Sequence, residues 1–149
     1  MTAEVETRPS ILIVDDEPRI LSSIQDLLEE EYSVEMCTDA LGALEKLQHH
    51  EVAVILSDQR MPGMQGHQFL AKAREISQAT RVLITGYSDQ EALVNAVNRG
   101  QIYAYVAKPW DPASLKATVA GAAEYHRLQM ELAHEIGRAS CRERVFRTV

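Results

Sequence analysis

Short apolar runs rich in β-branched residues recur along the chain, and each ends at a residue that can bind a ligand. We interpret four of these runs as strands: Ile11–Val14, Val52–Leu56, Val82–Ile84 and Ile102–Val106. Their length and composition are typical of buried parallel strands. The polar residues at their ends are Asp15, Asp16, Asp58, Thr85 and Lys108. Ligands of open α/β sheets bind beyond the carboxyl ends of the strands, so we expect these side chains to meet in one crevice.

Helical periodicity fills the intervals between the runs. Pro18 is typical of a first helical turn, apolar residues follow it at helical spacing, and a further strand is predicted over Ser33–Cys37. The other predicted helices cover 40–49, 66–76, the stretch from Asp89 to Gly100, and 113–132. Each connection is too short for anything but a crossover. The pattern therefore predicts a doubly wound α/β fold with a five-stranded parallel sheet.

The composition argues against several kinds of partner. The formal net charge is −7, whereas a nucleic-acid surface needs clustered lysine and arginine. The first ten residues are polar and no later stretch reaches the length of a membrane span, so we expect no membrane contact and a cytoplasmic location. Cys37 and Cys141 are the only cysteines, and they do not support a disulfide framework.

The end of the chain departs from this pattern. We divide the sequence into a flexible N-terminus at 1–9, one domain with an extended last helix at 10–132, and a tail at 133–149. The run from Glu135 to Val145 looks like the translation of a sequencing adapter joined to a truncated gene. We therefore expect the tail to be non-native and a downstream region to be lost or separate. An uninterrupted reading frame through these codons in the source gene would refute this.

Four motifs carry a family resemblance: Ile11–Pro18, Ser57–Gly66, Thr85–Tyr87 and Lys108–Trp110. In this order and at this spacing they resemble the receiver domain of two-component response regulators, over about residues 9 to 130. The resemblance implies a flavodoxin-like (βα)5 fold with strand order 2-1-3-4-5. It also implies a phosphoacceptor switch, not an enzyme with a diffusible substrate. The phosphoryl donor would be a sensor histidine kinase or a phosphotransfer protein.

Three carboxylates in one crevice suit Mg²⁺, which prefers oxygen ligands and takes one or two carboxylates together with water and phosphate oxygens. By resemblance, Asp16 and Asp58 ligate the ion directly, Asp15 acts through water, and the backbone carbonyl of Arg60 completes the protein ligands. Asp58 is the predicted phosphoacceptor, because a carboxylate can attack phosphorus to give an aspartyl phosphate. Asp15 and Asp16 also suit a helix N-cap before Pro18, which need not exclude the metal role.

The resemblance assigns the remaining roles. Lys108 pairs with the phosphoryl oxygens, and the family usually has a cis bond between this lysine and the following proline, which aims the ammonium into the crevice. The hydroxyl of Thr85 moves to bond the phosphoryl group, and Tyr105 turns inward into the space that this opens. The switch would change the surface over the fourth helix, fifth strand and fifth helix.

Three other functions are less consistent with these residues. A Mg²⁺-dependent phosphohydrolase also uses an aspartyl nucleophile, but it usually has a second acid two residues later, where this chain has Arg60. A flavin-binding domain needs a phosphate-binding loop after the first strand, and the acidic run Asp15–Glu17 would repel that phosphate. A pseudo-receiver that works without phosphorylation is disfavoured by the complete set of crevice residues.

One apolar stripe on the last helix has two interpretations. It contains Gly121, Tyr125, Leu128 and Leu132. Such a stripe is usually part of a core. Its later part, from Tyr125, is equally typical of the start of a coiled-coil linker through which the chain would form a homodimer.

Overall fold

The computed structural model describes residues 8–99 and 102–147, except for the side chains of Tyr87 and of residues 136–147. Residues 1–7 of the predicted flexible N-terminus therefore lie outside the described residues. Five parallel strands form one sheet in the predicted order, β2-β1-β3-β4-β5. The strands are β1 (Ser10–Val14), β2 (Ser33–Cys37), β3 (Val54–Asp58), β4 (Thr80–Thr85) and β5 (Ala104–Ala107).

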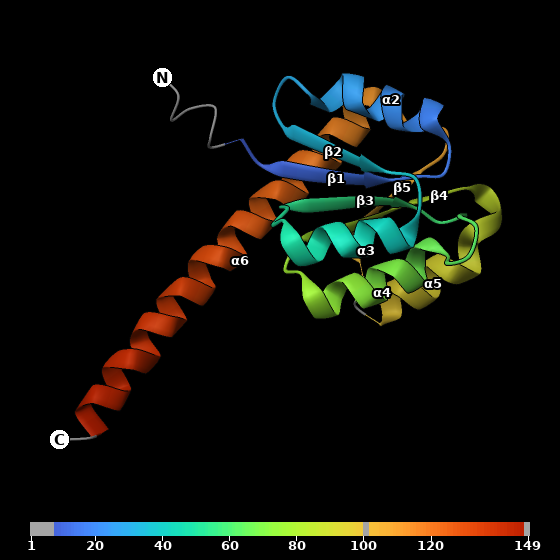
Figure 1. Cartoon of the computed structure of the whole chain (residues 1–149). Helices are drawn as coiled ribbons and strands as arrows, with labels where there is room; N and C mark the ends of the chain where they lie inside the picture. Colours follow the sequence, from blue (N-terminus) through green and yellow to red (C-terminus); the bar gives the residue numbers. More distant parts are fainter. Residues whose placement is uncertain (1–7, 100–101, 148–149) are drawn as a thin grey trace.

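Helices cover both faces of this sheet (Figure 1). They are α2 (Pro18–Leu28), α3 (Ala40–His49), α4 (Gly66–Ile76), α5 (Gln90–Asn98) and α6 (Pro112–Arg147), with a 3₁₀ turn, η1 (Tyr87–Asp89), before α5. Side chains of α2 and α6 belong to the core on one face, and those of α3, α4 and α5 to the core on the other. Alternate residues of β1 serve the two faces, Ile13 one and Leu12 the other. Burial on both sides explains why the central strands are unbroken apolar runs.

Local signals in the sequence set several helix starts. Pro18 occupies the first turn of α2, where its missing N–H costs nothing. The carboxylate of Asp39 accepts a hydrogen bond of 2.8 Å from the backbone N–H of Gly42 and so caps α3. Asp111 caps α6 in the same way, accepting from the N–H of Ser114 at 3.0 Å. These residues fix where the three helices begin.

Gly66 lets α4 begin close to the end of β3. Its backbone N–H donates to the carbonyl oxygen of Gln59 at 2.9 Å. A Cβ at this position would overlap the backbone carbonyl of Asp58. Only glycine allows this approach, which packs the start of α4 against the strand end that carries the predicted phosphoacceptor.

Several element boundaries differ from the prediction. β3 (Val54–Asp58) lies two residues later than the run Val52–Leu56, and β4 (Thr80–Thr85) extends beyond both ends of the run Val82–Ile84. β5 begins at Ala104 and not at Ile102, although the N–H of Tyr103 still donates to the carbonyl of Arg81 at 2.7 Å. The last helix continues past Leu132 to Arg147, because its sequence is rich in good helix formers and contains no proline after Pro112. No helix in the described residues is both long enough and apolar enough to cross a bilayer.

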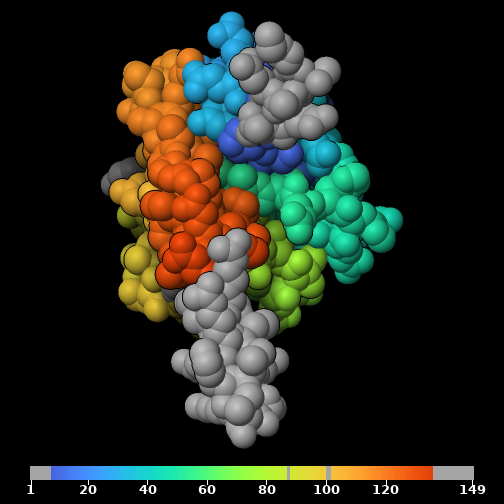
Figure 2. All heavy atoms as spheres, turned by 90° about the vertical axis from the view of Figure 1, so that its left-hand side faces the viewer, coloured from blue at the N-terminus to red at the C-terminus, as the bar shows by residue number. Residues whose placement is uncertain are grey.

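The core interpretation of the stripe on α6 is wrong for its larger side chains. Tyr125, Leu128 and Leu132 are 45%, 49% and 52% exposed. The face of α6 that enters the core carries Leu115, Val119 and Ala122 instead. The helix begins beside Lys108 and runs back past the edge where the strands start, and Figure 2 looks onto that edge, with α6 in orange beside the start of β1.

The contrast between buried and exposed leucines gives a test of the fold. Leu115 on α6 is fully buried in the core between α2, α6 and the sheet, whereas Leu41 on α3 is 71% exposed. We expect Leu115→Ala to lower the free energy of unfolding by about 3 kcal/mol, because it removes buried methyl groups and leaves a cavity. Leu41→Ala should change it by less than about 0.5 kcal/mol. Urea denaturation of both variants measures this, and equal losses would contradict the packing described.

Candidate functional site

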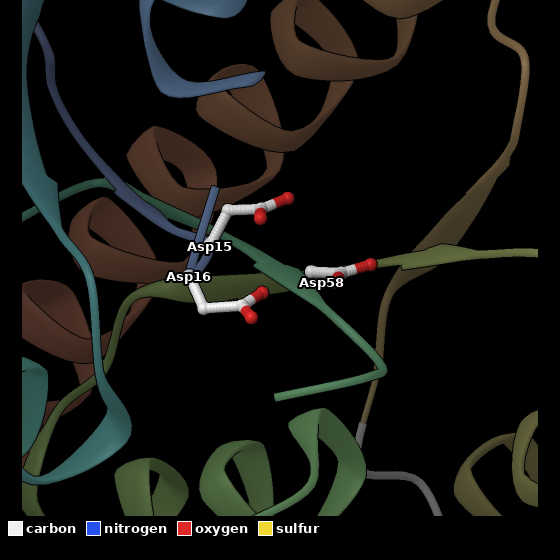
Figure 3. Close-up of side chains that lie close together, drawn as sticks. All are labelled: Asp15, Asp16 and Asp58. Carbon is white, nitrogen blue, oxygen red and sulfur yellow. The ribbon is translucent and has the colours of Figure 1, made fainter. Parts of the chain in front are cut away.

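The predicted crevice lies at the carboxyl ends of β1 and β3, where the strand order reverses. Asp15 and Asp16 follow the last residue of β1, and Asp58 is the last residue of β3. Figure 3 shows the three side chains leaving these neighbouring strand ends toward the same space. Each offers a carboxylate oxygen, and these oxygens all lie within 4.8 Å of one another. The structure therefore brings together the three carboxylates that the sequence predicted.

Asp15 is held in place by the backbone around it. Its carboxylate oxygen Oδ1 accepts a hydrogen bond of 2.9 Å from the N–H of Glu17, and its own N–H donates to the carbonyl of Cys37 at 3.1 Å. The other carboxylate oxygen, Oδ2, is buried and has no hydrogen-bond partner. Burial, with a smaller contribution from the charge of Asp58, raises the pKa of Asp15 to about 6. The N-cap of α2 is Glu17, so neither aspartate caps that helix.

Asp58 is paired with Lys108 across the crevice. The Nζ of Lys108 lies 2.6 Å from Oδ1 of Asp58, and the Lys108–Pro109 bond is cis, as the resemblance implied. Burial raises the pKa of Asp58, and the hydrogen bond and charge of Lys108 offset this only in part. Burial alone would lower the pKa of Lys108, but the pair with Asp58 outweighs it, so this pKa lies above its usual value. Lys108 is therefore charged at neutral pH.

Thr85 and Tyr105 lie where a switch between the crevice and the outer surface would need them. Thr85 ends β4, is buried, and accepts a backbone hydrogen bond of 2.8 Å from the N–H of Lys108 through its carbonyl. Tyr105 lies on β5 beside Leu83 of β4 and is 52% exposed. Its side chain is thus on the outside, the orientation that the resemblance assigns to the unphosphorylated state.

The side chain of Arg60 makes contacts that sequence reasoning missed. Its Nε donates to Oδ1 of Asp89 at 2.9 Å, and its Nη2 donates to the hydroxyl of Ser88 at 2.7 Å. Asp89 stands at the N-cap position of α5, but its side chain does not cap that helix. Its second oxygen, Oδ2, accepts from the N–H of Gly86 at 2.8 Å. The partners lie 29 positions apart, on two loops without periodicity, so no sequence signal pointed to the pair.

The residue after the predicted phosphoacceptor is also fixed by side-chain contacts. Gln59 is buried, its Oε1 accepts from the N–H of His67 at 3.0 Å, and its Nε2 lies 2.8 Å from Nδ1 of the same histidine. Burial lowers the pKa of His67, so the neutral ring serves as the acceptor here. The pair joins the end of β3 to the first turn of α4.

The residues present fit a magnesium ion. Three carboxylates converge, and the buried oxygen of Asp15 lacks the partner that a buried polar atom needs. Carboxylate and water oxygens are the ligands that Mg²⁺ prefers, and a divalent cation would offset the mutual repulsion of the three groups. Asp16 is exposed and Asp15 and Asp58 are buried, so the set is open to solvent on one side.

A further hollow lies away from the crevice. A pocket of about 720 Å³ lies at the opposite edge of the sheet, lined by the start of β1, the loop before β3 and α6. It includes none of the crevice residues. A more polar hollow of about 680 Å³ lies beside the crevice and is lined by residues that include Gln59, Arg60, His67 and Asp89.

Comparison with known proteins agrees with this geometry. A family model described as the response regulator receiver domain matches residues 11–120. The hydrogenase transcriptional regulatory protein HoxA of Cupriavidus necator is 39% identical over an alignment of 135 positions that covers 85% of this chain. The same stretch is 28% of HoxA, so the chain spans less than a third of that relative's length.

Solved structures agree as well. The signal receiver domain of an HD domain-containing protein from Pseudomonas fluorescens Pf-5 has a TM-score of 0.79 and 36% identity, and the match covers 83% of this chain and 93% of that one. A structure of an adenylate cyclase from Rhodopirellula baltica has a TM-score of 0.84 and 29% identity, covering 87% and 98% respectively.

The raised pKa of Asp15 predicts a pH dependence in metal-free buffer. The folded state holds the proton up to about pH 6, whereas the ordinary pKa is 3.8, so stability falls as the pH rises through this interval. We expect Asp15→Asn to remove this fall and to stabilise the protein by about 2 kcal/mol at pH 7.5, with little effect at pH 4.

Urea denaturation in EDTA at several pH values measures this. The control is Asp26→Asn, since Asp26 is an exposed carboxylate on α2 and its removal should leave the pH profile unchanged. An Asp15→Asn profile parallel to that of the wild type would show that Asp15 does not titrate in this range.

Proposed function

Because the chain belongs to the family of response regulator receiver domains, we propose that it is a switch that accepts a phosphoryl group on Asp58. One observation carries the proposal: the carboxylate of Asp58 is almost fully buried, yet it is paired with Lys108 at 2.6 Å and lies among two further carboxylates. A carboxylate in this position can bind a cation and can attack an incoming phosphoryl group. The family is one of phosphoacceptor switches.

The phosphodonor is a phosphohistidine of a sensor kinase or of a phosphotransfer protein. An oxygen of Asp58 attacks phosphorus, a P–O bond forms, and the bond from phosphorus to the donor's imidazole nitrogen breaks, with the electron pair leaving on that nitrogen. The ammonium of Lys108 then pairs with a phosphoryl oxygen. Phosphoryl transfer needs mainly positioning and charge neutralisation, which Lys108 supplies from the end of β5.

Asp15, Asp16, Asp58 and the backbone carbonyl of Arg60 are the proposed ligands of Mg²⁺. When bound, the ion neutralises charge on the phosphoryl oxygens. Asp16 is the exposed member of the set, so it is the carboxylate that meets an ion arriving from solvent. Asp15 is fixed by the N–H of Glu17, and its second oxygen has no hydrogen-bond partner and is therefore free to bind an ion.

The change in the crevice reaches the surface through Thr85 and Tyr105. Thr85 moves to donate its hydroxyl to the phosphoryl group, and Tyr105, now 52% exposed, turns into the vacated space. The surface that changes is formed by α5, β5 and α6. HoxA is named as a transcriptional regulator, and the structural relatives as an adenylate cyclase and an HD domain-containing protein. We propose that the output is a lost or separate domain or partner, with no direct contact to nucleic acid by this domain.

We also propose that α6 forms a homodimer. Tyr125, Leu128 and Leu132 are spaced by three and four residues and are all about half exposed, an arrangement that a second copy of the helix would cover. Tyr125 is fixed at the start of this stripe by Tyr103, since the two ring centroids lie 5.0 Å apart.

The phosphorylation proposal is tested by intact-mass spectrometry after incubation with acetyl phosphate and Mg²⁺. We expect one hydroxylamine-labile phosphoryl adduct, which is lost in Asp58→Asn and in EDTA. Asp26→Asn, which removes an exposed carboxylate from α2, should keep the adduct. An adduct that persists in Asp58→Asn would place the acceptor elsewhere. No adduct on folded wild-type protein, either here or with a panel of phosphorylated kinases, would favour a pseudo-receiver.

The dimer is tested by sedimentation with and without a phosphoryl mimic. We expect a dimer in at least one state and a monomer for Leu128→Lys, because the lysine places a charge within the covered stripe. Ile76→Lys on α4, at a site that is 41% exposed, is the matched control and should sediment like the wild type. A monomer in both states of the wild type would rule the dimer out.

A further inference from the structure

The ion pair between Arg60 and Asp89 connects the two loops on either side of the crevice. Arg60 lies two residues after Asp58, in the loop from β3 to α4, and Asp89 ends the turn η1 that follows β4. The contact is a 2.9 Å hydrogen bond between opposite charges, and the hydroxyl of Ser88 adds a second bond at 2.7 Å. Asp89 is 9% exposed at its side chain and Arg60 is 68% exposed.

Asp89 also holds the residue that follows Thr85. Its Oδ2 accepts the N–H of Gly86 at 2.8 Å while its Oδ1 is engaged by Arg60. The hydrogen bonds to Arg60 and Gly86 keep the pKa of Asp89 below its usual value despite burial, so the carboxylate is charged at neutral pH. One carboxylate thus ties the backbone beside Thr85 to the loop beside Asp58.

We propose that Arg60 and Asp89 are positioning residues that hold the Thr85 segment in its unphosphorylated conformation, through the hydrogen bond from Gly86 to Asp89. This rests on the proposed function and adds its regulation. Movement of Thr85 toward a phosphoryl group carries Gly86 with it. Asp89 must then either lose its hydrogen bond to Gly86 or move with Gly86 and lose its ion pair with Arg60. Arg60 cannot simply follow, because the contacts of the neighbouring Gln59 fix its loop.

The size of the effect follows from the exposure of the pair. Arg60 is mostly in solvent, and an ion pair of this kind contributes little. The pair therefore biases the two conformations and does not lock one of them. A ligand that binds the switched conformation gains affinity in proportion to the population of that conformation. Removing the pair should thus tighten the binding of a phosphoryl mimic by about two- to fivefold.

The test is a titration with beryllium fluoride in the presence of Mg²⁺, on the full chain, followed by the fluorescence of Trp110. Trp110 is the only tryptophan of the sequence and lies two residues after Lys108. We expect Arg60→Gln and Asp89→Asn to lower the apparent Kd by the same factor. The double variant should bind no more tightly than either single variant, because all three variants lack the same ion pair. Arg60→Lys, which keeps the charge, should return the Kd toward the wild-type value.

Arg127→Gln is the matched control. It breaks exposed ion pairs with Glu124 and Glu131 on α6, far from the crevice, and should leave the Kd unchanged. A role in stability alone would weaken binding or leave it unaltered, so the direction of the change decides. Unchanged or weaker binding in either single variant, or additive gains in the double variant, would overturn the proposal. Absence of Asp58-dependent binding in the wild type would instead overturn the proposed function and this inference with it.

Discussion

The ion pair between the buried Asp58 and the partly exposed Lys108 is the interaction on which the crevice depends. A carboxylate that is almost fully out of water needs a compensating charge, and breaking such a pair leaves the remaining charge buried alone. The two residues come from β3 and β5, which are not neighbours in the sheet. The pair therefore spans the end of β4, where Thr85 is the last residue. The strand order therefore determines which residues can form this ion pair.

Much of the fold follows from sequence because burial on both faces leaves a strong signal. The bounds of β2, α3 and α4 are as predicted, since capping and turn residues mark them in the sequence. Periodicity identifies residues that share a helix face but not what covers that face. The stripe from Tyr125 to Leu132 was therefore ambiguous, and the structure shows it about half exposed. The start of β5 was misplaced because Ile102 and Tyr103 have strand-like side chains but lie outside the ladder.

Some residues of the site could likewise be predicted from the sequence, and others could not. Asp15, Asp16, Asp58, Thr85 and Lys108 could be found because each marks the end of an apolar run, and parallel strands bring those ends to one edge. The pair of Arg60 and Asp89 could not, because both residues lie in loops whose relative placement depends on packing. The unpartnered oxygen of Asp15 is a property of three-dimensional burial alone. Composition and spacing carry no trace of it.

The direction of α6 has a consequence for how this domain combines with others. The strands begin, and α6 leaves, at the edge of the sheet opposite the crevice (Figure 1). A module fused before β1 or after α6 would therefore stand at the end of the sheet opposite the proposed phosphoacceptor. A phosphodonor and such a module would not compete for space, so the same receiver chemistry would suit unrelated effectors. A conformational change at the crevice would then have to reach the opposite end of the strands, about 16 Å away for a five-residue strand.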